Sequence, residues 1–451
     1  MGVLQRAQIH DDKWEESMFE TTANSAGMSA KDVRYATWVT LFAWVFAVYD
    51  FILFGTLLPE IGRHEGWSTA FQAELATWIA VGTAVIALLV GPAVDRMGRR
   101  NGIILTVSGA AICSALTAIG GGFGSLVLVL IRSLGGFGYA EQTVNATYLS
   151  ELYASAPPSV ARRRGFLYSL VQGGWPIGAL LAAALTAILL PFIGWQGCFI
   201  FAALPSLIIV VFARKLKETP QFLAHQLKRG RATAQDRDQD GLRATLRGST
   251  RRTTLVLGAA FLLNWFAIQV FSVLGTTVIT DVHHVSFESS LVVLILSNLV
   301  GYLGYLAFGF LGDRIGRRNA IALGWTIAGL LFTGMLYAPH SLGPVMVLYS
   351  LGLFFLIGPY AALLFFIGES FPTTIRATGG ALVAAMGPIG AILAGLGATY
   401  LLNAGSTWQL AALYFGAVPC FVSGLLICAA PKVNPGDVSE AEIAGVTQSL
   451  A

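Results

Sequence analysis

The chain has 451 residues, of which 55% are hydrophobic and only 12% are charged, and its mean hydropathy is +0.69. This composition excludes a soluble globular protein and indicates an integral membrane protein that is surrounded by membrane lipid. The formal charge of +4 comes from basic residues scattered between apolar segments, so it does not indicate a nucleic-acid partner.

Twelve apolar stretches are long enough to cross a bilayer, because about 20 helical residues span the roughly 30 Å hydrocarbon core. In chain order, they begin near residues 37, 72, 102, 124, 165, 195, 253, 288, 319, 343, 376 and 407. The residues before the first stretch are polar and lack the basic and apolar regions of a cleaved signal peptide. The sequence therefore predicts an all-α integral membrane fold with twelve transmembrane helices.

The distribution of the 28 Lys and Arg residues predicts the orientation of these helices. If the N-terminus is cytoplasmic, Arg63 is the only basic residue in an outer loop, and Arg132 is the only one deep inside a span. All the others then lie on the cytoplasmic side or at its border, as the positive-inside rule requires. We therefore expect both termini to be cytoplasmic in a monomeric, multi-pass protein of the cell membrane, which in bacteria is the inner membrane.

The first span, "WVFAVYDFILFGTLLPEI", contains a carboxylate at Asp50, where an unpaired charge in lipid is costly. At about 1.5 Å per residue, Asp50 lies about 20 Å from the cytoplasmic start of the first helix. By the same count, Arg132 lies about 12 Å from the outer start of the antiparallel fourth helix. The two residues reach similar depth, so we expect them to pair, either for proton coupling or as a static salt bridge.

A second acid, Glu141, lies nine residues after Arg132, half a turn out of phase and nearer the cytoplasm. It shares a polar stripe of the fourth helix with Asn145 and Tyr148, at i+4 and i+7. This stripe has two interpretations. Glu141 is either a second proton-coupling residue or a partner in a hydrogen bond that packs helices together.

The chain contains an internal repeat. The segment "GPAVDRMGRR" at 91–100 returns as "GFLGDRIGRR" at 309–318, with six of ten positions identical. The same offset carries Glu151 to Glu369. Ordered matches of this kind predict a duplication of six helices. The predicted parts are an N-terminal tail at 1–36, helical halves at 37–214 and 251–430, a polar cytoplasmic linker at 215–250, and a C-terminal tail at 431–451.

The repeated "GxxxDRxGRR" resembles the signature between the second and third helices of the major facilitator superfamily and its weaker copy in the second half. The segment "RSLGGFGYAEQTVNATYLSELY" resembles the fourth helix of the metabolite:proton symporters and of the sialate and lactate symporters. In those families Gly-Gly precedes the glutamate, whereas Tyr139 and Ala140 precede Glu141 here. "GESFPTTIRATGG" is similar to their connection between the tenth and eleventh helices. The resemblance implies a transporter in which an Asp and Arg pair couples protons.

Charged residues around the repeated loops predict a cytoplasmic gate. Asp95 and Asp313 lie where a helix ends and a basic turn begins, so they are placed to accept hydrogen bonds from Arg or from a helix N-terminus. The family resemblance implies that these contacts break and re-form as the halves rock. Positive-inside bias alone is the alternative explanation for the arginines, although it does not require the acids. The predicted gate comprises Asp95, Arg96, Arg99, Arg100, Glu151, Arg164, Asp313, Arg314, Arg317, Arg318, Glu369 and Arg376.

Polar and aromatic residues in the spans predict a substrate site between the halves. On the seventh helix, Trp265, Gln269 and Ser272 recur at i, i+4 and i+7. Other candidates lie beside Gly/Pro interruptions, which free the backbone to meet a ligand. Interhelical hydrogen bonding is the alternative for each residue taken alone. The candidate substrate residues are Tyr49, Arg132, Gln172, Trp175, Asn264, Trp265, Gln269, Ser272, Asn298, Tyr302 and Tyr360.

Other chemistries lack their motifs. No phosphate-binding loop, nucleophile elbow or metal-ligand spacing is present, so we predict no enzyme, no cofactor and no metal. The histidines of "DVHHVSFE" are predicted to lie in a solvated outer loop.

The sequence predicts a secondary active transporter that imports a small organic acid, an anionic carboxylate, with protons by alternating access. Arg132 is the only deeply placed cation, which suits a carboxylate substrate. A sugar or polyol symporter is the first alternative, because aromatic and amide groups also serve hydroxyl groups. A membrane sensor that binds without transporting is the second.

Overall fold

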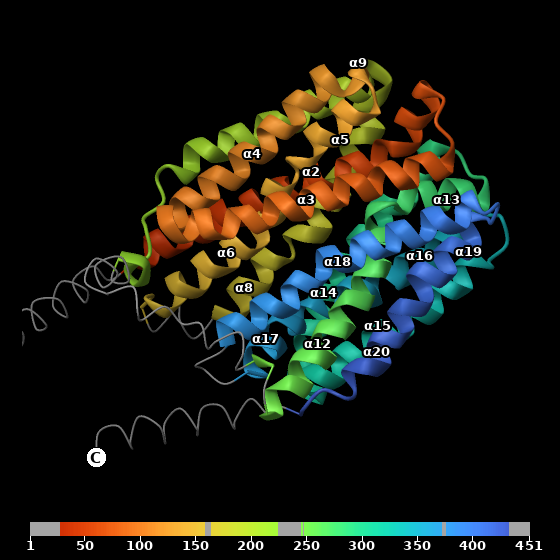
Figure 1. The fold of residues 1–451 in the computed structure, drawn as a ribbon. Helices are drawn as coiled ribbons and strands as arrows, with labels where there is room; N and C mark the ends of the chain where they lie inside the picture. The colour runs from red at the N-terminus through yellow and green to blue at the C-terminus, as the bar shows by residue number, and fades with distance from the viewer. Residues whose placement is uncertain (1–27, 158–163, 224–244, 247, 372–375, 433–451) are drawn as a thin grey trace, which may run out of the picture.

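The computed structural model of the chain describes residues 28–157, 164–223, 245–246, 248–371 and 376–432, all of them helices or connecting segments without a strand (Figure 1). The predicted all-α class is confirmed. The helices before the linker are α2 (Ala30–Glu65), α3 (Thr69–Met97), α4 (Arg99–Gly120), α5 (Ser125–Ser133), α6 (Gly136–Ala154), α8 (Arg164–Gln172) and α9 (Gly174–Ala213), with a short 3₁₀ turn, η1 (Gly121–Phe123).

The helices after the linker follow the same pattern of long and interrupted segments. They are α12 (Gly248–Ala267), the π-helical η3 (Ile268–Val273), α13 (Gly275–His283), α14 (Phe287–Ile315), α15 (Arg317–Leu336), α16 (Leu342–Ile357), α17 (Tyr360–Glu369), α18 (Arg376–Asn403), α19 (Trp408–Ala412), the π-helical η5 (Leu413–Ala417) and α20 (Val418–Ile427).

Glycines of the repeated motif end the long helices. Gly98, with φ of 98°, separates α3 from α4, and Gly316, with φ of 85°, separates α14 from α15. A residue with a Cβ is strained in this region, whereas glycine adopts it freely. The motif thus encodes a sharp turn at the same place in both halves.

Ten of the described helical stretches are long and apolar enough to cross a membrane, where the sequence predicts twelve spans. The difference arises at two places. The 47-residue stretch Leu167–Ala213 is interrupted at Gly194, whose φ of 66° and ψ of 178° are not helical. In addition, α5 and α6 are separated at Leu134 and Gly135, so α5, with 9 residues, is too short to cross alone, and α6, with 19, is not apolar enough.

Figure 1 shows α2 to α9 grouped at the upper left and α12 to α20 at the lower right. The two groups meet where α3 packs on α18, α9 on α14, and α2 on α13. One hydrophobic core cluster extends across both groups, and a second lies within the first group. We call the end of the molecule that carries residues 215–223 the linker end, and the end that carries Gly66 and His284 the opposite end.

Candidate functional site

A cavity of about 50 Å³ lies between the two groups of helices. It is smaller than a typical ligand pocket of roughly 300 Å³ or more, so its walls must separate to admit a substrate. Of the predicted substrate residues, Arg132, Trp265 and Gln269 line it. Its wall consists of Phe51, Phe54, Gly55, Ala76, Ile79, Ala80, Thr83, Arg132, Gly135, Tyr139, Trp265, Gln269, Val273, Leu274, Pro388 and Ala391.

Aromatic rings from four helices form a continuous chain beside this cavity. The ring centroids of Tyr139 and Trp265 are 5.5 Å apart, and those of Phe51 and Tyr139 are 5.9 Å apart. Trp175 joins the chain, with its ring 6.1 Å from Phe51 and 6.2 Å from Trp265. Because α2, α6, α9 and α12 each contribute one ring, the chain crosses from one half to the other. Such edges and faces suit a flat, unsaturated ligand.

Arg132 and Asp50 are in direct contact in the interior. Arg132 Nη1 donates to Asp50 Oδ1 at 3.2 Å, and Nη2 donates to the main-chain oxygen of Asp50 at 3.2 Å. The two side chains are only 2% and 1% exposed. The other carboxylate oxygen, Asp50 Oδ2, has no hydrogen-bond partner among the described residues, and neither has Arg132 Nε. The pair therefore leaves one acceptor and one donor unused by the described residues.

The arginine lies on the cavity wall and the acid lies behind it. Arg132 lines the cavity, and Asp50 does not. The guanidinium also lies 5.5 Å from the ring of Phe54 and 5.3 Å from that of Phe199, both within the range of cation–π attraction. On the far side, Ser114 of α4 donates a hydrogen bond to Asp50 Oδ1.

Glu141 lies in a separate place, fully buried among the helices before the linker. Thr106 of α4 hydrogen bonds to its Oε2, and Asn145 Nδ2 donates to its Oε1 at 3.1 Å. Asn145 Nδ2 also donates to the main-chain oxygen of Thr40 in α2 at 2.7 Å. The third member of the predicted stripe, Tyr148, instead donates to the main-chain oxygen of Lys217 at 2.9 Å.

Two pairs of predicted substrate residues contact each other outside the cavity lining. Trp175 Nε1 donates to Ser272 Oγ at 3.4 Å, which joins α9 to η3 across the two halves. Tyr360 donates to Asn264 Oδ1 at 2.6 Å. Both pairs place polar side-chain atoms close to the aromatic chain.

The remaining four predicted substrate residues do not line the cavity. Gln172 hydrogen bonds to Tyr168 on its own helix. Asn298 Nδ2 donates to the main-chain oxygen of Leu294, also on its own helix. Tyr302 lies against Gly173, and Tyr49 is fully buried with no partner for its hydroxyl among the described residues.

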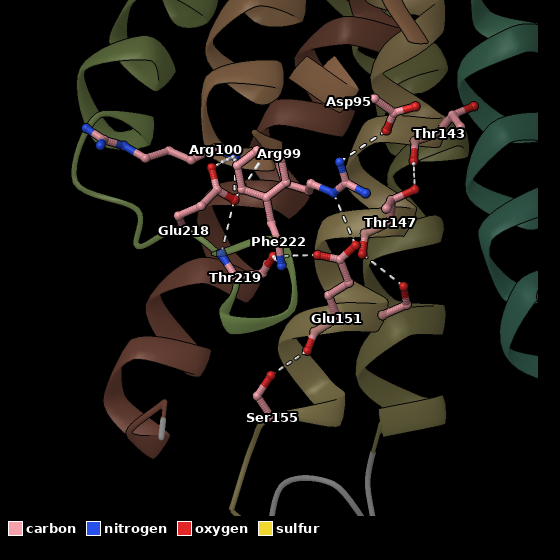
Figure 2. Close-up of polar contacts among 11 residues, drawn as sticks. Asp95, Arg99, Arg100, Thr143, Thr147, Glu151, Ser155, Glu218, Thr219 and Phe222 are labelled. Atoms are coloured by element: carbon pink, nitrogen blue, oxygen red, sulfur yellow. Dashed lines mark hydrogen bonds and ion pairs between the residues drawn. The ribbon is translucent and has the colours of Figure 1, made fainter. Parts of the chain in front are cut away.

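The first copy of the predicted gate is a network at the linker end (Figure 2). Arg99 donates to Asp95 through Nη1 and to Glu151 through Nε, each at 3.1 Å. Its guanidinium lies 5.2 Å from the ring of Phe222. Arg96 is exposed, and the side chain of Arg164 lies outside the described residues.

The second copy of the gate has a matching core. Arg317 pairs with Glu369, as Arg99 pairs with Glu151 one repeat earlier. Arg318 donates to the main-chain oxygen of Ala430 at 3.0 Å. Arg100 likewise donates to the main-chain oxygen of Arg214, so each motif reaches the end of the last helix in its own half. Arg314 packs on a ring of its own helix, Asp313 is exposed, and the side chain of Arg376 lies outside the described residues.

Residues at the start of the linker complete the first network. The sequence did not indicate this contribution of the linker. Glu218 accepts hydrogen bonds from the backbone N–H groups of Arg99 and Arg100, each at 3.1 Å. A carboxylate here satisfies free donors at the start of α4 and complements the helix dipole. Thr219 donates to Glu151, as Figure 2 shows. The one available signal was an acid followed by Thr-Pro, five residues after the end of an apolar span.

At the opposite end, one hydroxyl joins the two halves. Thr276 of α13 donates to the main-chain oxygens of Gly55 and Thr56 in α2, at 3.0 and 3.1 Å. Pro59 lies four residues after Gly55 and has no N–H, so the Gly55 carbonyl lacks its usual helical partner. Thr276 therefore donates a hydrogen bond to a carbonyl that has no donor within its own helix.

Only one histidine of "DVHHVSFE" departs from the solvated loop that the sequence predicts, because His284 is exposed after the end of α13 whereas His283 is buried. His283 is only 2% exposed, at the end of α13, and its Nε2 lies 3.3 Å from Met335 Sδ. It is buried because α13 continues one turn further than its polar sequence suggests. No group of three metal-ligating side chains is found in the described part of the chain.

Comparison with known proteins supports these observations. The model of the Major Facilitator Superfamily matches residues 40–367. The chain is similar to the gallate transporter of Pseudomonas putida, with 26% identity over 85% of this chain and 89% of the relative. It is equally similar to the cis,cis-muconate transport protein of Acinetobacter baylyi, with 26% identity over 82% and 89%. A crystal structure of a D-xylose-proton symporter matches with a TM-score of 0.65 and 19% identity, covering 89% of this chain and 98% of that one.

Proposed function

Because the chain belongs to the major facilitator superfamily, we propose that it imports a small organic acid together with protons by alternating access. It is a transporter of the cell membrane with several spans, and not an enzyme. Within the proposal, the halves at 37–214 and 251–430 contribute six spans each, and both termini and the linker are cytoplasmic. The linker end is then the cytoplasmic end, and a monomer is sufficient for transport.

The observation that carries the proposal is the position of Arg132 between the cavity and Asp50. While Asp50 is ionised, it holds the guanidinium through Oδ1 and its own main-chain oxygen. Protonation removes the negative charge, so Arg132 is released to pair with an anionic group in the cavity. Proton and anion then favour each other's binding, as thermodynamic linkage requires.

The proposed substrate is a flat, unsaturated carboxylate. Arg132 supplies the planar donor set that matches a carboxylate, and the rings of Phe51, Tyr139 and Trp265 supply apolar faces beside it. The names of the relatives support this choice, because gallate and cis,cis-muconate are unsaturated carboxylates. Thr83 and Gln269, the neutral polar residues of the wall, are suited to a substituent such as a hydroxyl group.

The experiment uses purified protein in liposomes with an imposed pH gradient. Asp50→Asn mimics the protonated acid, so it is expected to bind and exchange an aromatic carboxylate but not to accumulate it. Accumulation by Asp50→Asn at the wild-type level would refute proton coupling through this pair. Accumulation of a sugar or polyol in place of the acid by the wild-type protein would favour the sugar alternative, and binding without any transport would indicate a sensor.

A further inference from the structure

Aromatic rings from three helices lie at the linker end of the cavity wall. On α2 the wall contains Phe51, Phe54 and Gly55, and Phe51 is the one nearest the linker end. The corresponding wall residues of α6 and α12 are Tyr139 and Trp265. The ring of Tyr139 contacts both neighbours, with centroids 5.9 Å from Phe51 and 5.5 Å from Trp265. We call these three rings the aromatic floor of the cavity.

Arg132 lies on the same face of the chain as Tyr139. Arg132, Gly135 and Tyr139 recur at i, i+3 and i+7, and all three line the cavity. Leu134 and Gly135, between α5 and α6, keep right-handed helical backbone angles. The Gly135 N–H donates to the Arg132 oxygen at 2.9 Å, and the Tyr139 N–H donates to the Gly135 oxygen at 3.0 Å. Seven residues at about 1.5 Å each therefore place Tyr139 about 10 Å from Arg132, toward the linker end.

This spacing is independent of how far the two groups of helices stand apart. The cavity of about 50 Å³ must widen to hold a substrate. Arg132 and Tyr139 both precede the linker, whereas Trp265 follows it. Separation of the two groups as rigid bodies moves Trp265 away from Tyr139 but leaves the distance along α5 and α6 unchanged. Tyr139 is therefore the part of the aromatic floor that stays at a constant distance from Arg132.

We propose that Tyr139 sets the maximum length of the substrate. With its carboxylate on Arg132, the substrate extends along the face of α5 and α6 until its far end meets the Tyr139 ring. The two side chains occupy part of the distance of about 10 Å between their helical positions, which leaves room for one six-membered ring or a chain of similar length. An acid with a second ring in line must displace Tyr139. The inference rests on the proposed function, because it requires a carboxylate at Arg132.

The test compares the affinities of purified protein for benzoate and for biphenyl-4-carboxylate, which carries one more ring in line with its carboxylate. Tyr139→Ala removes the ring that the second ring of the probe would meet. By calorimetry, the affinity for biphenyl-4-carboxylate relative to benzoate is expected to rise by about 10-fold, because burying a further aromatic ring contributes at least this factor.

A larger side chain at the same position tests the opposite change. Tyr139→Trp shortens the space between the floor and Arg132. It is expected to weaken binding of 4-hydroxybenzoate, whose substituent points away from the carboxylate, more than it weakens binding of benzoate. This comparison requires only that the variant binds benzoate.

Phe54→Ala is the matched control, because it removes a ring from the same cavity at the level of the carboxylate. Phe54 lies three residues after Phe51, toward the opposite end, and its ring is 5.5 Å from the Arg132 guanidinium. Its removal widens the cavity beside Arg132 and not at the floor. Phe54→Ala is expected to weaken both acids by a similar factor and to leave the ratio of their affinities unchanged.

The outcomes separate this inference from the proposal on which it rests. If wild-type protein binds benzoate and Tyr139→Ala keeps the wild-type ratio, or Phe54→Ala raises the ratio equally, the length limit is overturned and carboxylate binding stands. If Tyr139→Ala does not bind benzoate, Tyr139→Trp decides: selective loss of 4-hydroxybenzoate supports the limit, and an equal effect on both acids refutes it. Failure of wild-type protein to bind any of these acids overturns the proposed function and the inference with it.

Discussion

With the linker end cytoplasmic, as proposed, replacing Thr276 by valine should open the outer side of the transporter. Valine has nearly the shape of threonine but cannot donate to the Gly55 and Thr56 oxygens that Thr276 contacts at 3.0 and 3.1 Å. Thr276 is fully buried, and its hydroxyl has one hydrogen, so the two contacts count as one shared bond. Pro59 has no N–H to donate to the Gly55 oxygen. In the variant, this carbonyl therefore has no hydrogen-bond donor, either from its helix or from a side chain, while the outer side is closed.

The expected cost falls on the closed state alone. Losing a hydrogen bond and leaving a buried carbonyl unsatisfied costs about 1 to 2 kcal/mol. When the outer side opens, water can reach the same carbonyl, so the open state loses little. The ratio of open to closed molecules should therefore rise by roughly 5- to 30-fold.

Labelling of a cavity cysteine measures this ratio. Ala76→Cys places a thiol on the cavity wall, and a membrane-impermeant maleimide is applied to the outer face of vesicles. Thr276→Val should increase the labelling rate, whereas Thr280→Val is the matched control. Thr280 Oγ1 donates only within its own helix, to the Thr276 oxygen at 2.9 Å and the Thr277 oxygen at 3.1 Å. An unchanged rate in Thr276→Val, or an equal increase in Thr280→Val, would refute the reasoning.

Three further substitutions test the site and the linker. Arg132→Lys should weaken carboxylate binding by about 2 kcal/mol, because an ammonium lacks the planar donor set, and calorimetric affinity equal to wild type would contradict this. Trp265→Leu should reduce the preference for an aromatic over an aliphatic acid by about 1 kcal/mol, measured by competition for uptake, and no change in preference would remove Trp265 from the binding surface. Glu218→Ala should destabilise the protein by about 1 kcal/mol and speed proteolysis of the linker, because it removes the contacts at the start of α4. An unchanged rate of proteolysis would show that these contacts contribute nothing.

Features that depend on local sequence or on depth in the membrane were predictable. The two motif glycines mark turns because a positive φ leaves a local signature. The contact between Asp50 and Arg132 could be expected because each charge is costly alone in lipid and helix geometry puts both at one level. Belonging to the major facilitator superfamily followed from the same motif and is confirmed.

Features that depend on which face of a helix meets which neighbour were not predictable. Phe51 and Phe54 lie in an apolar span, where composition does not separate a cavity wall from a lipid contact. Asn298 satisfies a carbonyl of its own helix, an outcome that periodicity does not distinguish from ligand binding. Tyr139 carried a signal, since it stands where related families have glycine, but its place beside Trp265 follows from tertiary packing.

The matching contacts of Arg100 and Arg318 predict how the protein responds to a break in the polypeptide between its two halves. Each arginine ties the third helix of its half to the main-chain oxygen at the end of the last one, Arg214 or Ala430. The linker contacts of Glu218 and Thr219 lie before Leu223 and involve the first half alone. A break after Leu223 therefore leaves every one of these ties within a single fragment. Two separately translated polypeptides, co-expressed in one cell, are expected to reassemble into a working carrier.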